Sequence, residues 1–132
     1  MRKILADTGP LYAALDPDDQ YHERAQAEYN QFEIEQIAII IPIPVYLETY
    51  SLLLYRLGNA QAIAFARECL EADCLLNPSL NDYQTALNQA SQFTDQRITL
   101  TDATTAILSK ALNLSVWTYD FHFDVMRVPV WR

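Results

Sequence analysis

The stretch that decides the fold runs from Ile98 to Val125 and reads ITLTDATTAILSKALNLSVWTYDFHFDV. Its first half predicts a helix, because apolar residues recur there at helical spacing. Thr99 or Thr101 can cap this helix, which places Asp102 in its first turn. Asn113 suits the left-handed position that often ends a helix. The sequence therefore predicts a capped helix with an acid at its start.

A short buried strand is expected directly after this helix. Residues 115–119 form a largely apolar run, and Asp120 follows at its end. Such a run is typical of a strand that is covered on both faces. A right-handed crossover brings the start of a helix and the end of a parallel strand to the same edge of the sheet. Open α/β sheets place their sites at that edge, so we expect Asp102 and Asp120 to lie near each other.

The rest of the chain continues the alternation of strands and helices. Further strands are predicted at residues 3–6, 37–41, 74–76 and 128–131. Further helices are predicted at residues 11–15, from a cap at Asp18 or Asp19 to about residue 32, at residues 45–57, after a cap at Asn59, and after Ser79 or Asn81. The two adjacent helices that follow residue 41 can form a hairpin that stands off the sheet as a surface for a partner. The predicted fold class is a three-layer α/β/α domain with a mainly parallel sheet of four to five strands.

Length, charge and hydropathy narrow the kind of protein. A chain of 132 residues suits one domain, so residues 1–132 are expected to form a single domain. The net charge of −8 does not favour binding of nucleic acid by a broad basic face, whereas it suits acids gathered around a cation. Cys69 and Cys74 match no metal motif and are expected to be reduced thiols. Neither a signal peptide nor a membrane helix is apparent, which favours a cytoplasmic protein.

Four acids stand at organised places along the chain. Asp7 ends the first strand, Asp102 opens a helix and Asp120 ends a late strand. Taken singly, each has a structural interpretation, because an acid commonly follows a strand or starts a helix. Glu48 lies in a helix with nearly all-apolar neighbours, so we expect it to be at least partly buried and paired.

Convergence of these four acids would have a chemical consequence. Repulsion between carboxylates raises their pKa values, and a divalent cation removes that penalty. All four are hard oxygen ligands without a His or Cys cluster beside them, which favours Mg²⁺ or Mn²⁺ over zinc. One or two such ions can hold a phosphodiester, lower the pKa of a bound water and stabilise the leaving oxygen.

Four segments of the chain match the motifs of one known family, in that family's order. They are LADTGPLYAALDPDDQYHERA at 5–25, IPIPVYLETYSLLLYRLG at 41–58, ITLTDATTAILSKALNLSVWTYD at 98–120, and the FHF that follows. With these segments the chain resembles PIN-domain ribonucleases, and most of all the small VapC-type toxins of type II toxin–antitoxin pairs. Each motif is short, but the ordered set covers most of the chain.

The resemblance implies a parallel sheet flanked by helices and Mg²⁺-dependent endonucleolytic hydrolysis of RNA phosphodiester bonds by water. It implies that the metal-binding acids are Asp7, Glu48, Asp102 and Asp120, with Thr8 and Thr118 as small polar residues beside them. It also implies two protein partners. One is a second copy of the chain in a homodimer, and the other is a small antitoxin with a segment that blocks the acidic pocket.

Three further side chains have two interpretations each. Asp124 follows Asp120 by one turn and is a second candidate for the fourth metal ligand. His122 is a candidate general base, although a surface position or a supporting position beside the metal ligands is commoner, because water activated by a metal needs no side-chain base. Arg56 can contact an RNA phosphate, although a solvated arginine near a helix end is the more common case.

Three rival functions stay open. An RNA-processing or repair nuclease of the same fold would have no cognate inhibitor encoded beside it. A catalytically silent binding module would have no need of the four acids. A phosphoacceptor receiver domain also gathers acids at strand ends, but it needs a lysine at a strand end, and Lys3 and Lys110 are poorly placed for that role.

Overall fold

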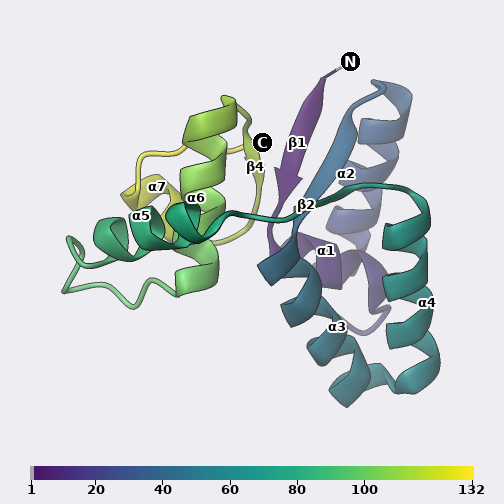
Figure 1. The fold of residues 1–132 in the computed structure, drawn as a ribbon. Helices are drawn as coiled ribbons and strands as arrows, with labels where there is room; N and C mark the ends of the chain where they lie inside the picture. Colours follow the sequence, from purple (N-terminus) through teal and green to yellow (C-terminus); the bar gives the residue numbers. More distant parts are fainter. Residues whose placement is uncertain (1) are drawn as a thin grey trace.

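A four-stranded parallel sheet forms the centre of the fold (Figure 1). The computed structural model describes residues 2–132. The strands are β1 (Lys3–Ala6), β2 (Ala38–Pro42), β3 (Leu75–Leu76) and β4 (Val116–Trp117), in the spatial order β3-β2-β1-β4. All neighbouring strands are parallel. The predicted parallel sheet of four to five strands is therefore confirmed with four strands.

Seven helices within the described residues cover the two faces of this sheet. Their bounds are α1 (Thr8–Leu15), α2 (His22–Ile34), α3 (Ile43–Leu57), α4 (Asn59–Glu71), α5 (Leu80–Ala90), α6 (Leu100–Leu112) and α7 (His122–Val125). In Figure 1, α1 to α4 lie on one side of the sheet and α5 to α7 on the other. This is the predicted three-layer α/β/α arrangement. Across residues 2–132, no helix combines the length and the apolar character needed to cross a membrane.

The helix that opens the quoted stretch forms as predicted. Thr99 is the N-cap of α6, and its Oγ1 accepts a hydrogen bond of 3.1 Å from the backbone N–H of Asp102. Asn113 ends the helix in the left-handed conformation, with φ of 55°. The strand β4 that follows is short and pairs with the end of β1. The cap therefore sets where Asp102 lies relative to the sheet.

Two predicted helix caps are wrong. Helix α2 begins at His22 without a side-chain cap, because the Asp19 carboxylate accepts a hydrogen bond of 2.8 Å from the N–H of Tyr21 instead. Gly58, with φ of 97°, ends α3 and also precedes α4. Asn59 is therefore the first residue of α4 rather than its cap. The same glycine serves both helices because it adopts a conformation that a side chain disfavours.

The predicted last strand at 128–131 is reduced to a single parallel bridge between Val116 and Val130. Pro129 interrupts this segment, since proline has no N–H to donate to a sheet. Its carbonyl still accepts a hydrogen bond of 2.9 Å from the N–H of Val116. The C-terminal segment therefore follows the edge of β4 without becoming a full strand.

The core is divided in two by the alternation of side chains along the strands. Ala6 belongs to the cluster beneath α1 to α4, and its neighbour Leu5 to the cluster beneath α6 and α7. Trp117 is fully buried, as predicted for the core, and its ring centroid lies 5.0 Å from that of Phe32. Trp131 packs on the same Phe32 ring at 4.6 Å.

Helices α3 and α4 form the predicted hairpin, which extends beyond the sheet in Figure 1. The Tyr46 hydroxyl on α3 donates a hydrogen bond of 3.2 Å to the carbonyl of Ala66 on α4, and its ring packs 5.7 Å from that of Phe65. The buried residues of α3 recur every four positions and are Val45, Thr49 and Leu53. The helix therefore buries a single narrow face.

Candidate functional site

Asp7 lies directly after β1, at the carboxyl edge of the sheet. Its backbone N–H donates a hydrogen bond of 3.0 Å to the carbonyl of Trp117, so the adjacent strand β4 holds it in place. The side chain is only 5% exposed. Its Oδ2 accepts a hydrogen bond of 2.7 Å from the Thr118 hydroxyl, and the backbone N–H of Thr8 also donates to the carboxylate. A buried carboxylate is thus positioned by one donor at the start of α1 and another directly after β4.

Thr118 links this carboxylate to Asp120. Its Oγ1 donates to Asp7 and also accepts a hydrogen bond of 3.0 Å from the backbone N–H of Asp120. Asp120 Oδ1 accepts a hydrogen bond of 2.9 Å from the N–H of His122. The Nδ1 of His122 lies 3.2 Å from the same oxygen, at ion-pair distance but without hydrogen-bond alignment. The segment after β4 is therefore folded back so that its acid and its imidazole point the same way.

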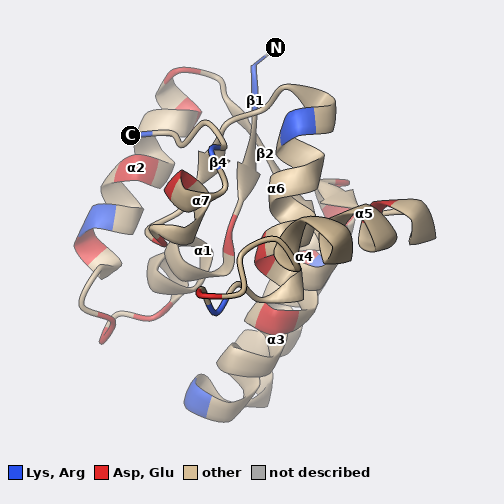
Figure 2. Cartoon of the chain, turned by 90° about the vertical axis from the view of Figure 1, so that its left-hand side faces the viewer, with Lys and Arg blue, Asp and Glu red and all other residues tan. Residues whose placement is uncertain are grey.

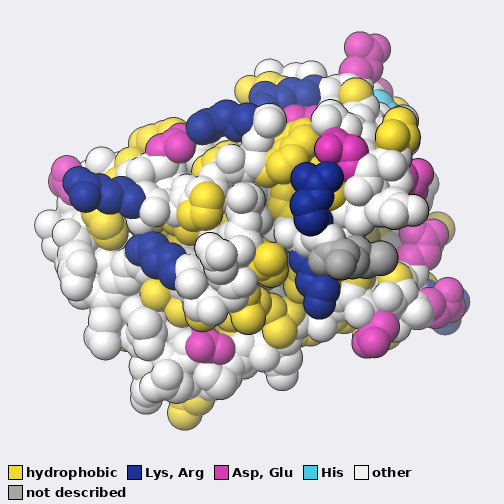
Figure 3. Space-filling view, turned by 90° about the horizontal axis from the view of Figure 1, so that it is seen from above, with side chains coloured by type: hydrophobic (Ala, Val, Ile, Leu, Met, Phe, Trp, Pro, Cys, Tyr) yellow, Lys and Arg dark blue, Asp and Glu magenta, His cyan; other side chains and the backbone are white. Residues whose placement is uncertain are grey.

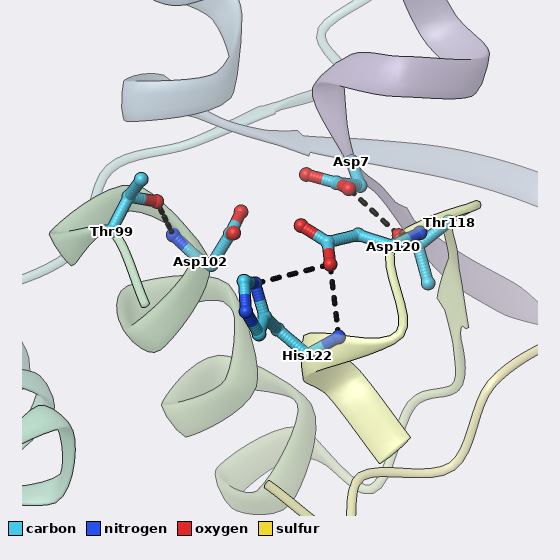
Figure 4. A network of polar contacts seen from close by, with 6 residues as sticks. All are labelled: Asp7, Thr99, Asp102, Thr118, Asp120 and His122. Atoms are coloured by element: carbon cyan, nitrogen blue, oxygen red, sulfur yellow. Dashed lines mark hydrogen bonds and ion pairs between the residues drawn. The ribbon is translucent and has the colours of Figure 1, made fainter. Parts of the chain in front are cut away.

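Asp102 completes the group from the first turn of α6. The end of β1 and the adjoining end of α6 carry neighbouring acidic positions in Figure 2, and their side chains point toward one another in Figure 4. Asp102, Asp120 and His122 each offer one ligand atom, and these atoms all lie within 4.8 Å of one another. We call Asp7, Asp102, Asp120 and His122 the acid cluster. The structure thus unites three of the four acids that the sequence singled out, together with a histidine.

The acidities in this cluster are strongly perturbed. Burial, followed by the negative charges of Asp7 and Asp120, raises the pKa of the Asp102 carboxyl from 3.8 to about 8. Burial also raises the pKa of Asp7 to about 6, against the hydrogen bonds from Thr118 and Thr8 that lower it. Near neutral pH, the cluster without a cation therefore favours retention of a proton among its carboxylates.

The donor set of the cluster fits a divalent cation. Carboxylate oxygens are the preferred ligands of Mg²⁺ and Mn²⁺, and a nearby imidazole is compatible with Mn²⁺. A cation would remove the repulsion that raises the acid pKa values. The hydroxyl of Thr8 is buried after Asp7 without a hydrogen-bond partner in the described residues, so the site has polar capacity that the protein itself leaves unused.

Glu48 is more exposed than the sequence predicted. It is exposed and has no ion pair among the described residues, whereas the sequence predicted a partly buried and paired charge. The reason is that α3 buries only the narrow face that contains Val45 and Thr49, and Glu48 lies off that face. Its charge is nevertheless close enough to raise the pKa values of Asp7 and Asp102. Glu48 therefore borders the acid cluster from the solvent side.

Two other candidates lie apart from the cluster. Asp124 is exposed, and its Oδ2 accepts a hydrogen bond of 2.9 Å from the Arg132 side chain. Arg56 is exposed, with its guanidinium carbon 5.0 Å from the centre of the Tyr12 ring. His122, by contrast, is half-buried beside Asp120 and belongs to the cluster rather than to the open surface. The signal available for it was its position two residues after Asp120, at the start of a short helix.

A large cavity lies elsewhere in the molecule. It has a volume of about 650 Å³, with helices α2 and α4 as walls and strand β2 as floor. Its lining is mostly apolar and includes Ile39, Ile41 and Phe65. The acids Glu33, Glu68 and Asp73 stand among the exposed residues that line it. We call this cavity the α2–α4 groove. None of the acid cluster lines it.

Solved structures with a similar fold extend over nearly the whole chain. VapC20 from Mycobacterium tuberculosis, described as a toxin that cleaves the sarcin-ricin loop, aligns with a TM-score of 0.83 and 19% identity over 98% of this chain and 98% of that chain. FitAcB from Neisseria gonorrhoeae aligns with a TM-score of 0.72 and 21% identity over 98% and 96%. VapBC2 from Rickettsia felis, bound to a DNA fragment from its promoter, aligns with a TM-score of 0.70 and 15% identity over 98% and 99%. At these identities the likeness is one of fold.

Sequence comparison provides a second and independent finding. None of the curated proteins matches the chain at a significant level. A family model for the PIN domain, however, matches residues 4–128 and so includes all of the acid cluster. This match agrees with the fold and with the acids at the carboxyl edge of the sheet, since all three indicate the same family. The chain therefore belongs to the PIN domain family.

Proposed function

We propose that the chain is an endoribonuclease that depends on Mg²⁺, or on Mn²⁺, and that it is the toxin of a toxin–antitoxin pair. The observation on which this rests is the convergence of Asp7, Asp102 and Asp120, with the pKa of Asp102 raised to about 8. Acids that repel one another at a buried edge destabilise the fold unless a cation or a proton lies among them. Binding of a cation offers a functional reason for this arrangement.

The residues have distinct parts in this proposal. Asp7, Asp102 and Asp120 hold the cation, and Glu48 approaches it from the solvent side. Thr118 orients two of the acids, because its hydroxyl donates to Asp7 and accepts from the N–H of Asp120. A divalent cation supplies the charge that lowers the pKa of the attacking water and stabilises the leaving oxygen. Asp124 and Arg56 are assigned no part in holding the cation.

RNA is the proposed substrate for two reasons. The motifs of the chain resemble those of VapC-type ribonucleases, and the toxin with the most similar fold among those named above is described as cleaving the sarcin-ricin loop. The alternative of an RNA-processing nuclease without a toxin role has the same chemistry. The two differ in whether a cognate inhibitor is encoded beside the chain.

A small antitoxin is the proposed protein partner, and the α2–α4 groove is the proposed place for one of its segments. The groove is apolar inside and has acids among its exposed lining residues, including Glu33 and Glu68. It therefore suits an apolar segment with basic residues at its flanks. FitAB and VapBC2, two solved structures with a fold similar to that of this chain, are each bound to a DNA fragment. Their paired names support a complex with a second protein. A second copy of the chain, in a homodimer, is a further proposed partner.

The test is cleavage of a panel of structured RNAs in the presence of Mg²⁺, Mn²⁺ or EDTA. The unmodified chain is expected to cut with either metal and not with EDTA. Asp102→Asn is expected to lower the rate by more than about 100-fold, which exceeds the usual effect of losing an outer partner of a metal ligand. Asp95→Asn, at an exposed position in the loop before α6, removes the same charge outside the cluster and is expected to cut at the normal rate.

Two results would contradict the proposal. Cleavage that survives Asp102→Asn would place the chemistry outside the acid cluster. An absence of cleavage with every metal, together with an absence of Mn²⁺ binding by calorimetry, would instead support a catalytically silent binding module.

A further inference from the structure

A second hollow lies directly beside the acid cluster. Its volume is about 230 Å³, and Thr118 and Asp120 belong to its lining as well as to the acidic site. The remaining lining comes from α2, from the segment after β4 and from the C-terminal end of the chain. We call this hollow the flank pocket and define it by Arg24, Tyr119, Phe121 and Arg132. A polymer held at the acid cluster would have its next unit at this pocket.

Two arginines and two acids line the flank pocket, and two of these residues, Arg132 and Asp124, form an ion pair of 2.9 Å. The guanidinium carbon of Arg24 lies 4.1 Å from the centre of the Tyr119 ring, and its Nε is 3.5 Å from Glu28. Glu28 is itself held by hydrogen bonds from the hydroxyl of Tyr119 and from the indole N–H of Trp117. Arg24 therefore lies over an aromatic ring, while its side chain stays 52% exposed. A guanidinium in this position is available to a phosphate.

These arginines matter because positive charge is scarce near the acidic site. The chain has a net charge of −8 with nine Lys and Arg residues. Lys and Arg side chains are spread over the face at the amino ends of the strands, seen in Figure 3, and the acid cluster lies at the opposite edge of the sheet. A polyanion that approaches the acid cluster thus meets Arg24 and Arg132 beside it.

An exposed aromatic ring completes the pocket. Phe121 follows Asp120 directly, is 62% exposed, and its ring centroid lies 4.4 Å from that of His122. Single exposed aromatic residues are common on protein surfaces. This one differs because it lies in a pocket with two guanidinium groups and adjoins the acidic site. Aromatic stacking together with positive charge is how proteins hold unpaired nucleotides.

We propose that the flank pocket binds an unpaired nucleotide next to the scissile phosphate, with its base stacked on Phe121 and its phosphate in contact with Arg24. This inference rests on the proposed ribonuclease function. It predicts that the enzyme selects RNA in which the nucleotide beside the cut is free of base pairing. A base within a duplex could not leave its stack to lie on Phe121 without loss of pairing.

The test measures binding separately from cleavage. All variants are made in the Asp102→Asn background, and their affinities for a fluorescein-labelled ten-nucleotide single-stranded RNA are measured by anisotropy with Mg²⁺ present. Phe121→Ala is expected to weaken binding by about 5- to 100-fold, the usual effect of removing one stacking ring. Phe121→Tyr is expected to bind within about twofold of the parent, because tyrosine restores the ring. Leu80→Ala is the matched control, since Leu80 is 75% exposed on α5 and does not line the pocket.

Two further measurements sharpen the result. Arg24→Gln is expected to weaken binding and to reduce its dependence on salt, since one phosphate contact is lost. The affinity for the same RNA annealed into a duplex is also measured. Phe121→Ala is expected to change this affinity no more than Leu80→Ala does. The inference is overturned if Phe121→Ala binds the single strand as well as the parent does. It is also overturned if Phe121→Ala weakens binding of the duplex as much as binding of the single strand.

The two proposals can fail separately. The unmodified chain could cleave RNA with metal while Phe121→Ala has no effect on single-strand binding. That result would support the proposed nuclease and contradict the role of the flank pocket. Binding that needs Phe121, in a chain that cleaves no RNA with Mg²⁺ or Mn²⁺, would leave a single-strand binding pocket without the nuclease.

Discussion

The acid cluster and the α2–α4 groove differ in the side chains that form them, which are charged in the cluster and mostly apolar in the groove. The groove has a volume of about 650 Å³, a floor of β2 side chains and mostly apolar walls. The acid cluster consists of three carboxylates and an imidazole, held by hydrogen bonds from Thr118 and from backbone N–H groups. The groove can bind by removing apolar surface from water, whereas the cluster can bind by charge.

This difference teaches that the size of a hollow is a poor guide to its chemistry. The groove is larger than the flank pocket, about 650 Å³ against about 230 Å³, yet it lacks any grouped set of ligands among the described residues. Parallel sheets place the ends of their strands at one edge, and that topology gathers the acids without needing a deep cavity. Three predictions separate the two regions, ordered by expected size.

The largest expected difference is in the response to pH. Because Asp102 with a pKa of about 8 and Asp7 with a pKa of about 6 must lose their protons to bind a cation, Mn²⁺ affinity should rise by up to about 10-fold per unit between pH 6 and 8 and then level off. Calorimetry in two buffers of different ionisation enthalpy would count the protons released. In the groove, burial raises the pKa of the Cys69 thiol to about 12, so that thiol stays neutral over this range.

The same shifts affect the stability of the metal-free chain. A carboxyl group with a raised pKa binds more protons when folded than when unfolded, so the folded chain loses stability as pH rises from about 4 to about 8. Bound Mn²⁺ should remove this loss. A Mn²⁺ affinity that is the same at pH 6 and pH 8 would contradict the assigned role of the cluster.

A smaller effect is expected from the hydroxyl that connects two of the acids. Thr118→Val removes the donor to Asp7 and the acceptor for the N–H of Asp120 while keeping the shape of the side chain. Mn²⁺ affinity and the cleavage rate should both fall by about 10-fold. The pH profile should move to higher pH, because the lost hydrogen bond no longer lowers the pKa of Asp7. Thr118→Ser keeps the hydroxyl and serves as the control, and an unchanged pH profile in the valine variant would rule out a positioning role.

The smallest effect on cleavage is expected from a change in the groove. Tyr29 lines the groove and is 40% exposed. Tyr29→Ala should leave the cleavage rate within about twofold and the free energy of unfolding within about 0.5 kcal/mol, as for most surface positions. Cleavage assays and urea unfolding would measure both. A loss of cleavage comparable with that of Asp102→Asn would mean that the two regions are one functional unit.

Much of the fold was predictable from local sequence signals. The bounds of β1 agree with the predicted strand, and α6 has its predicted cap and its left-handed end at Asn113. These elements have short-range causes, namely capping chemistry and apolar periodicity. Errors occurred where two local signals compete, as at Gly58, which takes the cap position expected for Asn59. They also occurred where a proline prevents pairing, as in the segment that contains Pro129.

The site was predictable in its backbone positions but not in its side-chain environment. The carboxyl-edge rule places Asp7 and Asp120 beside the start of α6, and the structure has them there. Burial of Glu48 could not be inferred from its apolar neighbours, because the phase of α3 against the sheet decides which residues are covered. The place of His122 depends on how the chain turns after Asp120, and that turn is made by side-chain to backbone bonds that sequence spacing does not reveal.

The hydrogen bond between Thr118 and Asp7 joins positions that are 111 residues apart. Proteins are made from the N-terminus, so a ribosome produces Asp7 well before it reaches Asp120. A nascent chain that stops after α6 has no Thr118 to hold Asp7 and no Asp120 to complete the cluster. In the proposed toxin, the acid cluster should therefore form only after Asp120 has been made.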